Sequence, residues 1–192
     1  EAEIASVAED FGFGATLEIP LTVTPSSFPR GMDQAQLMLS SFGQFDVRVT
    51  PLQIAMISAA VANDGVVMKP SLVDEVIAPN LSVIRSSEPS IYSRPFSTGT
   101  AAELTRMMVG NVERGVASGA IISGLNVAGK TGTARMVGPS GYDDERHAAW
   151  FAGIAPVSDP RIVVVVLINE PGAGVTGGGA VAAPVFARVA KR

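Results

Sequence analysis

The 192-residue chain contains no cysteine, which excludes a disulfide framework and any metal site built on thiolates. Histidine is almost as scarce. The single His147 has no second imidazole beside it in the sequence, and such a residue is more often a surface hydrogen-bonding group than a metal ligand or a base. A net charge of −4 leaves no basic stripe for nucleic acid. We therefore expect no metal site and no nucleic-acid partner, and nothing in the sequence predicts a cofactor.

Long hydrophobic runs are also missing. The longest strongly apolar run covers residues 162–168, whereas a membrane-spanning helix needs about 20 apolar residues. Hydrophobic residues nevertheless make up 47% of the chain, enough to bury a core. The first residues, EAEIASVAEDFG, read like the middle of a helix. We therefore expect residues 1–192 to form one segment of a larger domain, without an internal boundary.

Two helices are predicted in the first third of the chain. Residues 1–11 place Ile4, Val7 and Phe11 on one apolar face. The second helix begins at TPLQ, where Thr50 is the expected N-cap and Gln53 the expected partner in a capping box. It is apolar nearly all round, which predicts a buried central helix ending at the Asn-Asp-Gly stop of residues 63–65.

The rest of the chain predicts mainly strands, with two further helices. Short strands are expected over residues 66–78, broken at Pro70, followed by a helix from Thr100 to residue 112 with Glu103 in a capping box. The apolar run after the PVSDP turn is typical of a strand buried on both faces, and that turn predicts an antiparallel hairpin. The later elements are expected at residues 127–136, 148–155 and 161–169 as strands, and at 180–191 as a helix.

Residues 124–131, GLNVAGKT, match the pattern of a phosphate-binding loop. That loop requires a helix beginning at its Lys-Thr pair, but the next residues are GTARMVGP, in which glycine and proline prevent a long helix. A second glycine pattern, GAGVTG at residues 172–177, resembles a dinucleotide-binding turn. Too little chain follows it for the second strand of that unit, so we interpret it as a flexible loop.

Acidic residues 143–145 lie just before His147 in the stretch GYDDERH. Such clusters are usually solvated faces, so we do not predict a metal site there.

The second half of GLNVAGKTGTAR has a different chemical meaning. Lys130 on a strand supplies a fixed positive charge, while the hydroxyls of Thr131 and Thr133 can bind a carboxylate. Gly132 lets a substrate backbone lie against the strand. Backbone N–H groups at an exposed strand edge can bind a peptide as an added strand and stabilise an oxyanion.

Several segments around this motif occur in a recognisable order: FGFG, SSFGQFDVRVTPLQIAMISAAVANDGVVMKP, VAGKTGTAR, WFAGIAP and VAAPVFARV. Together they closely resemble the second half of the transpeptidase domain of class B penicillin-binding proteins, and in particular the actinobacterial penicillin-binding protein A type. The resemblance implies an α+β fold of the β-lactamase/transpeptidase kind, in which helices flank both faces of an antiparallel sheet. Residues 1–192 would form the C-terminal part of that domain.

The family resemblance also implies an activity. Family members cross-link peptidoglycan through a serine acyl-enzyme formed on stem peptides ending in D-Ala-D-Ala, and β-lactams acylate the same serine. By motif, Lys130 would be the lysine of the third family motif. Thr131, Gly132 and Thr133 would bind the substrate or β-lactam carboxylate, and the Thr133 backbone N–H would complete the oxyanion hole.

The family's two other motifs, S-x-x-K with the nucleophile and S-x-N, are absent from these residues. Both would lie upstream of residue 1, together with a membrane anchor that places the enzyme on the outer face of the cytoplasmic membrane. The segment alone is therefore expected to be inactive without its upstream half. A serine β-lactamase relative and a catalytically dead penicillin-binding module remain alternatives.

Overall fold

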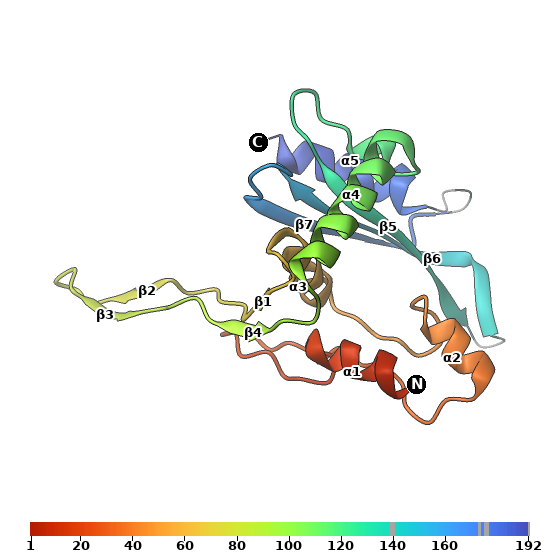
Figure 1. Ribbon diagram of the computed structural model, residues 1–192, viewed down its shortest axis with the longest axis horizontal. Coiled ribbons are helices and arrows are strands. Elements are labelled where there is room, and N and C mark those ends of the chain that lie inside the picture. Colours follow the sequence, from red (N-terminus) through yellow and green to blue (C-terminus); the bar gives the residue numbers. More distant parts are fainter. Residues whose placement is uncertain (139–140, 173, 175–176, 192) are drawn as a thin grey trace.

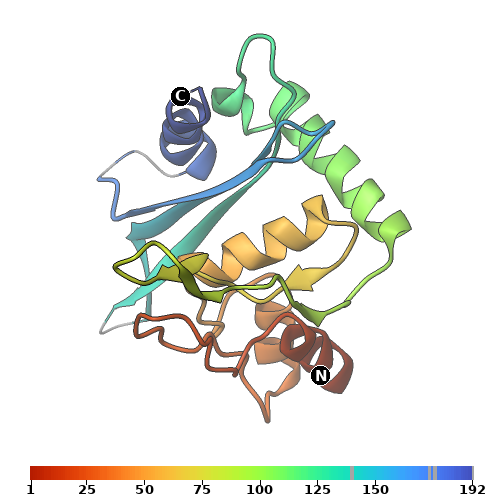
Figure 2. The ribbon, with the colours of Figure 1, turned by 90° about the vertical axis from the view of Figure 1, so that its left-hand side faces the viewer.

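A three-stranded antiparallel sheet forms the centre of the molecule. The computed structural model describes residues 1–138, 141–172, 174 and 177–191, and only the backbone of residues 144 and 145. The sheet has the order β5-β6-β7, with α5 on one side and α3 on the other (Figure 2). This arrangement confirms the predicted α+β class with helices on both faces. The strands are β5 (Ala128–Gly138), β6 (Gly141–Ala155) and β7 (Ile162–Asn169).

All three predicted strands are present, and β6 and β7 form the expected antiparallel hairpin. The prediction that the last strand is buried on both faces is wrong, because Ile162 and Leu167 are 41% and 37% exposed. β7 lies at one edge of the sheet, and within the described ranges nothing pairs with its outer side. β6 begins at Gly141, earlier than predicted.

α5 (Gly178–Ala190) packs tightly on the sheet and confirms the predicted closing helix. Phe186 lies edge-on to Phe151 with ring centroids 5.1 Å apart, and both side chains are fully buried. Glycine makes this approach possible. A Cβ on Gly178 would lie 1.9 Å from the Trp150 carbonyl oxygen, and one on Gly153 would lie 2.4 Å from the Phe186 ring. The sequence therefore places glycine where helix and sheet come closest.

α3 (Pro51–Ala62) covers the opposite face of the sheet and confirms the second predicted helix. Thr50 caps it by accepting the Gln53 N–H at 3.2 Å. The reciprocal half of the predicted capping box is wrong, because the buried Gln53 side chain instead donates to the Phe11 carbonyl at 2.6 Å. Helix α3 is therefore tied to the end of α1 by a buried polar contact.

α4 (Thr98–Arg114) runs beside β5 and is longer than predicted. Its N-cap is Ser97, which accepts the Thr100 N–H at 3.1 Å, so the predicted capping box of Thr100 and Glu103 is wrong. The Glu103 carboxylate instead pairs with Arg106 at 2.6 Å on the exposed face of the helix.

α1 (Ala2–Asp10) confirms the first predicted helix, but its predicted apolar face is not fully buried. Ile4 and Val7 are 39% and 47% exposed, and Ala5 is the buried residue of this helix. A short helix that the sequence reading missed, α2 (Gln34–Ser40), lies near α1 (Figure 1). Asp33 begins it with a complete capping box in which Gln36 is the partner.

Four short strands complete the fold outside the central sheet. β1 (Val67–Met68) pairs with β4 (Ile91–Ser93) beside α3, and β2 (Glu75–Ile77) pairs with β3 (Val83–Ser86). β1 and β2 confirm the predicted strands on either side of Pro70, whereas β3 and β4 were not predicted. Residues 71–90, which we call the ribbon, project away from the rest of the molecule as a long antiparallel extension (Figure 1). A single 3-10 turn, η1 (Ser118–Ala120), packs against α5.

Candidate functional site: the outer edge of strand β5

The K-T-G motif lies inside β5, beginning two residues after the start of the strand. Lys130 and Thr131 are therefore in extended backbone, not at the start of a helix. No array of helix N-terminal amides can point at a phosphate from this position. The geometry agrees with the rejection of a phosphate-binding loop and leaves the strand interpretation.

The motif's side chains divide between the two faces of the sheet. Lys130 pairs in register with Ala152 and shares the face covered by α3. Thr131 and Thr133 lie on the face covered by α5. There the Thr133 hydroxyl accepts the Gly178 N–H at 3.4 Å, and the side chain remains exposed. The lysine charge and the two hydroxyls are thus presented on either side of one strand edge.

Backbone groups of the motif point away from β6. The Gly129 carbonyl accepts a 2.8 Å bond from the Asn111 side chain of α4, and the Thr131 carbonyl accepts a 2.6 Å bond from the Lys130 ammonium group. Alternate residues of an antiparallel strand direct both backbone groups to the same side. The Thr133 N–H therefore also faces the outer edge, where no strand of the described chain pairs with β5.

An open cleft of about 650 Å³ borders this edge. Its walls come from β5, β6, α3, α4 and the segment between α2 and α3. The lining is largely apolar, and of the residues that form it Lys130 alone is charged. The lining residues are Phe13, Phe42, Gly43, Gln44, Val47, Val49, Ile54, Ile57, Ser58, Val61, Leu104, Met108, Lys130, Thr131, Gly132, Thr133, Ala134, Ala148, Trp150 and Ala152.

This charge distribution favours an anionic ligand. Lys130 is exposed, and it is the one cation among the residues that line the cleft, so it can attract a carboxylate without competition from an acidic side chain of the lining. No carboxylate or imidazole lines the described cleft, so Lys130 and the hydroxyls of Ser58, Thr131 and Thr133 are its ionisable and hydroxyl-bearing side chains. The cleft as described can bind and orient an acid.

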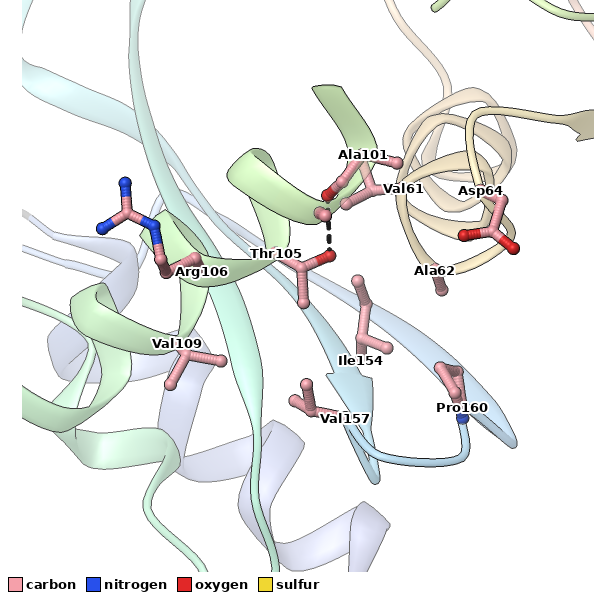
Figure 3. A pocket seen from close by; sticks show the side chains of 11 residues that line it. Val61, Ala62, Asp64, Ala101, Thr105, Arg106, Val109, Ile154, Val157 and Pro160 are labelled. Carbon is pink, nitrogen blue, oxygen red and sulfur yellow. Dashed lines mark hydrogen bonds between the residues drawn. The ribbon is translucent and has the colours of Figure 1, made fainter. Parts of the chain in front are cut away.

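A second cavity, of about 530 Å³, lies between α3, α4 and the β6–β7 turn (Figure 3). Its lining is mostly aliphatic, and its charged residues are Asp64 and Arg106. Arg106 is already paired with Glu103, and the Thr105 hydroxyl donates to the Ala101 carbonyl at 2.9 Å within the helix. Arg106 and Thr105 therefore already have partners, and the described lining of this cavity offers no unpaired strand edge like that of β5.

The other sequence candidates lie elsewhere. His147 lies on β6, where it pairs in register with Arg135 of β5, and it is not among the lining residues of the cleft. The side chains of residues 144 and 145 lie outside the described residues, as do residues 173, 175 and 176 of the GAGVTG stretch. Just after β7, Glu170 pairs with Arg146 at 2.6 Å. This hydrogen bond and the arginine charge lower the pKa of the Glu170 carboxyl, and the same bond and the carboxylate charge raise the pKa of Arg146.

The family model of the penicillin binding protein transpeptidase domain matches residues 1–191 of the chain. The chain belongs to the penicillin-binding transpeptidase family. Peptidoglycan D,D-transpeptidase PbpA of Mycolicibacterium smegmatis is 38% identical over 185 residues, covering 95% of this chain and 37% of that protein. Peptidoglycan D,D-transpeptidase FtsI of Escherichia coli is 37% identical over 150 residues, covering 78% of this chain and 24% of that protein.

Solved structures agree with this family membership. Penicillin-binding protein A from Mycobacterium tuberculosis, as a ceftriaxone acyl-enzyme complex, superposes with a TM-score of 0.91 at 34% identity, covering 100% of this chain and 43% of that one. The predicted likeness to the penicillin-binding protein A type is confirmed. The chain spans less than half of the length of these relatives. Among its described residues, no helix is long and apolar enough to cross a membrane.

Sequence reasoning placed the site at residues 130–133 and missed most of the cleft wall. Phe42, Gly43 and Gln44 belong to the SSFGQF segment, and Trp150 belongs to WFAGIAP, two segments that carried the family resemblance but had no predicted role. Ser58 on α3 was also missed. The usable signal was the resemblance itself, because the aromatic residues and glycines of these segments lie far from the motif in sequence. The roles of Lys130, Thr131, Gly132 and Thr133 stay predictions.

Proposed function

We propose that this chain supplies the carboxylate-binding wall of a peptidoglycan D,D-transpeptidase that also reacts with β-lactams. The observation that carries the proposal is the KTGT sequence on the unpaired edge of β5, with Lys130 facing an otherwise uncharged cleft. The relatives support it. PbpA and FtsI are named peptidoglycan D,D-transpeptidases, and the M. tuberculosis protein forms an acyl-enzyme with ceftriaxone.

The β5 edge is suited to both steps of acyl transfer. A serine oxygen attacks the carbonyl carbon of the penultimate D-Ala, and the terminal D-Ala leaves as its amine takes up a proton. An acceptor amine then attacks the acyl-enzyme and releases the serine. The outward Thr133 N–H can stabilise the oxyanion of both tetrahedral intermediates, because it is a fixed dipole that needs no reorganisation.

The terminal carboxylate of the stem peptide, or that of a β-lactam, would bind between Lys130 and the hydroxyls of Thr131 and Thr133. A charge-assisted bond of this kind is stronger than a neutral one. Gly132 also suits the pairing of β5 with β6, because an added Cβ here would lie 3.2 Å from the Trp150 Cβ. Binding along the edge would hold the scissile carbonyl near the Thr133 N–H.

The nucleophile is proposed to come from an upstream half of the same protein that carries S-x-x-K and S-x-N. Neither motif occurs in residues 1–192. The apolar wall of the cleft and the exposed Phe42 offer a surface on which such a half can pack. We also propose that a membrane anchor in that upstream region holds the enzyme at the outer face of the cytoplasmic membrane.

The test is covalent labelling with a fluorescent penicillin, read on a denaturing gel. Residues 1–192 alone should not be labelled, and the same residues joined to their upstream region should be. Labelling of the isolated segment would show that its nucleophile lies within these residues. No labelling of a folded joined protein would instead favour a catalytically dead module.

The lifetime of the bound drug provides the second readout. A transpeptidase should release the acyl group slowly, over hours, because no general base deacylates it efficiently. Rapid hydrolysis with repeated turnover would assign the protein to the serine β-lactamases. A circular dichroism spectrum of each preparation controls for misfolding.

A further inference from the structure

The ribbon of residues 71–90 is the least covered part of the described chain. Large apolar side chains are exposed on both strands and on the turn between them, including Ile77 at 52%, Ile84 at 66% and Leu81 of the turn at 82%. Adjacent residues of a strand point to opposite faces. Val76 and Ile77 are both exposed, so neither face of the ribbon is covered by the rest of the molecule, as its projection in Figure 1 also shows.

The ribbon also has unpaired strand edges. β2 pairs with β3 and with no other strand among the described residues. The Ser87 N–H donates to the Asp74 carbonyl at 2.7 Å, and the Ala78 N–H donates to the Ser82 carbonyl at 2.8 Å, so these groups point inward. By alternation, the N–H and C=O groups of Glu75 and Ile77 point away from β3. An isolated two-stranded ribbon is marginally stable in water, and a third strand would stabilise it.

The charges on the ribbon indicate which kind of segment would fit as a third strand. Asp74, Glu75 and Glu88 carry negative charge on the ribbon, against one Arg85. Glu18 adds a further carboxylate to the groove of about 570 Å³ at the ribbon's base, where Lys69 is the one basic residue of the lining. None of these four carboxylates forms an ion pair in the part of the chain that the structure describes.

Charge argues against two other occupants, and the direction of the ribbon argues against a third. A second copy would bring two acidic ribbons together, and an anionic lipid surface would repel the carboxylates. The ribbon points away from the N-terminus and from the side of the molecule that carries α1 and α2 (Figure 1), which disfavours the protein's own upstream region. We propose that the ribbon is a docking site for an extended, basic segment of a separate protein, which adds to β2 as a third strand.

This interaction would recruit a partner without touching the β5 cleft. Main-chain bonds along the Glu75 and Ile77 edge would supply affinity, and the exposed aliphatic side chains would pack against alternate residues of the added strand. The carboxylates would select lysine- or arginine-bearing segments and speed their association.

The experiment uses fluorescence anisotropy on the protein produced with its upstream region. The probe is a labelled ten-residue peptide of alternating lysine and valine, and the matched peptides are a glutamate–valine version and a lysine–valine version with alternate amides N-methylated. We expect the unmodified lysine–valine peptide to bind and the other two peptides not to bind. N-methylation should abolish binding because it removes strand pairing but keeps the charge.

Two double variants each replace two aspartate or glutamate residues with lysine, one pair on the ribbon and one pair away from it. Asp74→Lys with Glu75→Lys should weaken binding by at least about tenfold, whereas Asp10→Lys with Asp64→Lys should leave it unchanged. No binding, equal binding of the acidic peptide, or binding insensitive to N-methylation would overturn the proposal. So would ribbon-dependent self-association in sedimentation or ribbon-dependent binding to phosphatidylglycerol vesicles. Penicillin labelling should be the same in all variants, so this result and the test of the proposed function are independent.

Discussion

β5 and the ribbon both expose a strand edge, but the two edges differ in what lies behind them. β5 is backed by a sheet, by α5 through Phe151 and Phe186, and by α4 through Asn111. The ribbon is backed by nothing in the described chain. An edge held in place by packing can position reacting atoms to within a fraction of an ångström. An edge without such support is suited to recruitment, because a partner can order it on binding.

The largest difference in the free energy of unfolding should appear when one apolar side chain is truncated in the central sheet and one on the ribbon. Phe151→Ala removes a fully buried ring and should lower the free energy of unfolding by about 4 kcal/mol. Ile84→Ala on the ribbon should change it by less than about 0.5 kcal/mol. Urea denaturation measures both. Similar losses for the two variants would mean that the ribbon packs on the body.

A slightly smaller effect is expected where α5 meets the sheet. Gly178→Ala places a Cβ 1.9 Å from the Trp150 carbonyl oxygen, a backbone atom that cannot rotate away, and should cost about 3 kcal/mol. Gly177→Ala is the matched control, because an added Cβ there meets nothing within 4 Å. Thermal unfolding of both variants checks the packing of the sheet that supports β5. Equal Tm values would contradict the close approach.

Removing a side-chain hydrogen bond should also cost more stability beside β5 than on the ribbon, although both losses should be smaller. Asn111→Ala removes the bond to the Gly129 carbonyl next to the site and should cost about 1 kcal/mol. Asn80→Ala removes bonds to Ser82 at the exposed ribbon turn and should cost no more than a few tenths of a kcal/mol. Chemical denaturation resolves the two values. A larger loss for Asn80 would reverse the order of the two regions.

The smallest effect concerns an exposed ion pair at the end of the sheet. Arg146 lowers the pKa of the Glu170 carboxyl below its ordinary value of 4.5. The pair therefore stabilises the folded state above that pH, and the contribution is lost as the pH falls through the lowered pKa. Glu170→Gln should slightly lower the Tm at pH 7 and leave it unchanged in strong acid. A Tm difference that grows on acidification would contradict this sign.

Sequence patterns predicted the sheet, α3, α5 and the KTGT strand because each has a strong local signal: apolar runs, the Thr50-Pro51 helix start, or a motif. Side-chain partners were less predictable. The Gln53 side chain has two possible partners, the Thr50 backbone N–H of a local capping box and the Phe11 carbonyl, and the choice depends on how α1 packs. The Asp33 capping box of α2 was a readable signal that was overlooked. Ser97, three residues before the predicted cap, begins α4 instead.

Burial was predicted least well. The apolar patterns of α1 and β7 indicated buried faces, but burial depends on what lies opposite, which a local pattern cannot specify. The second strand of the ribbon was missed for a related reason. Because neither face of the ribbon is buried, its sequence lacks the regular apolar–polar alternation that marks a half-buried strand. The cleft wall also could not be predicted from one motif, because Phe42, Ser58 and Trp150 meet Lys130 only after folding.

Lys130, at the supported edge of β5, is proposed to bind the carboxylate of the substrate. The most direct measurement is the second-order rate constant of acylation by a fluorescent penicillin, for the joined protein and two lysine variants. Lys130→Gln should lower this constant on the order of 100-fold, because a neutral amide replaces the cleft's cation, while Lys69→Gln should leave it unchanged. Equal rate constants for the wild type and a folded Lys130→Gln variant would contradict the claim.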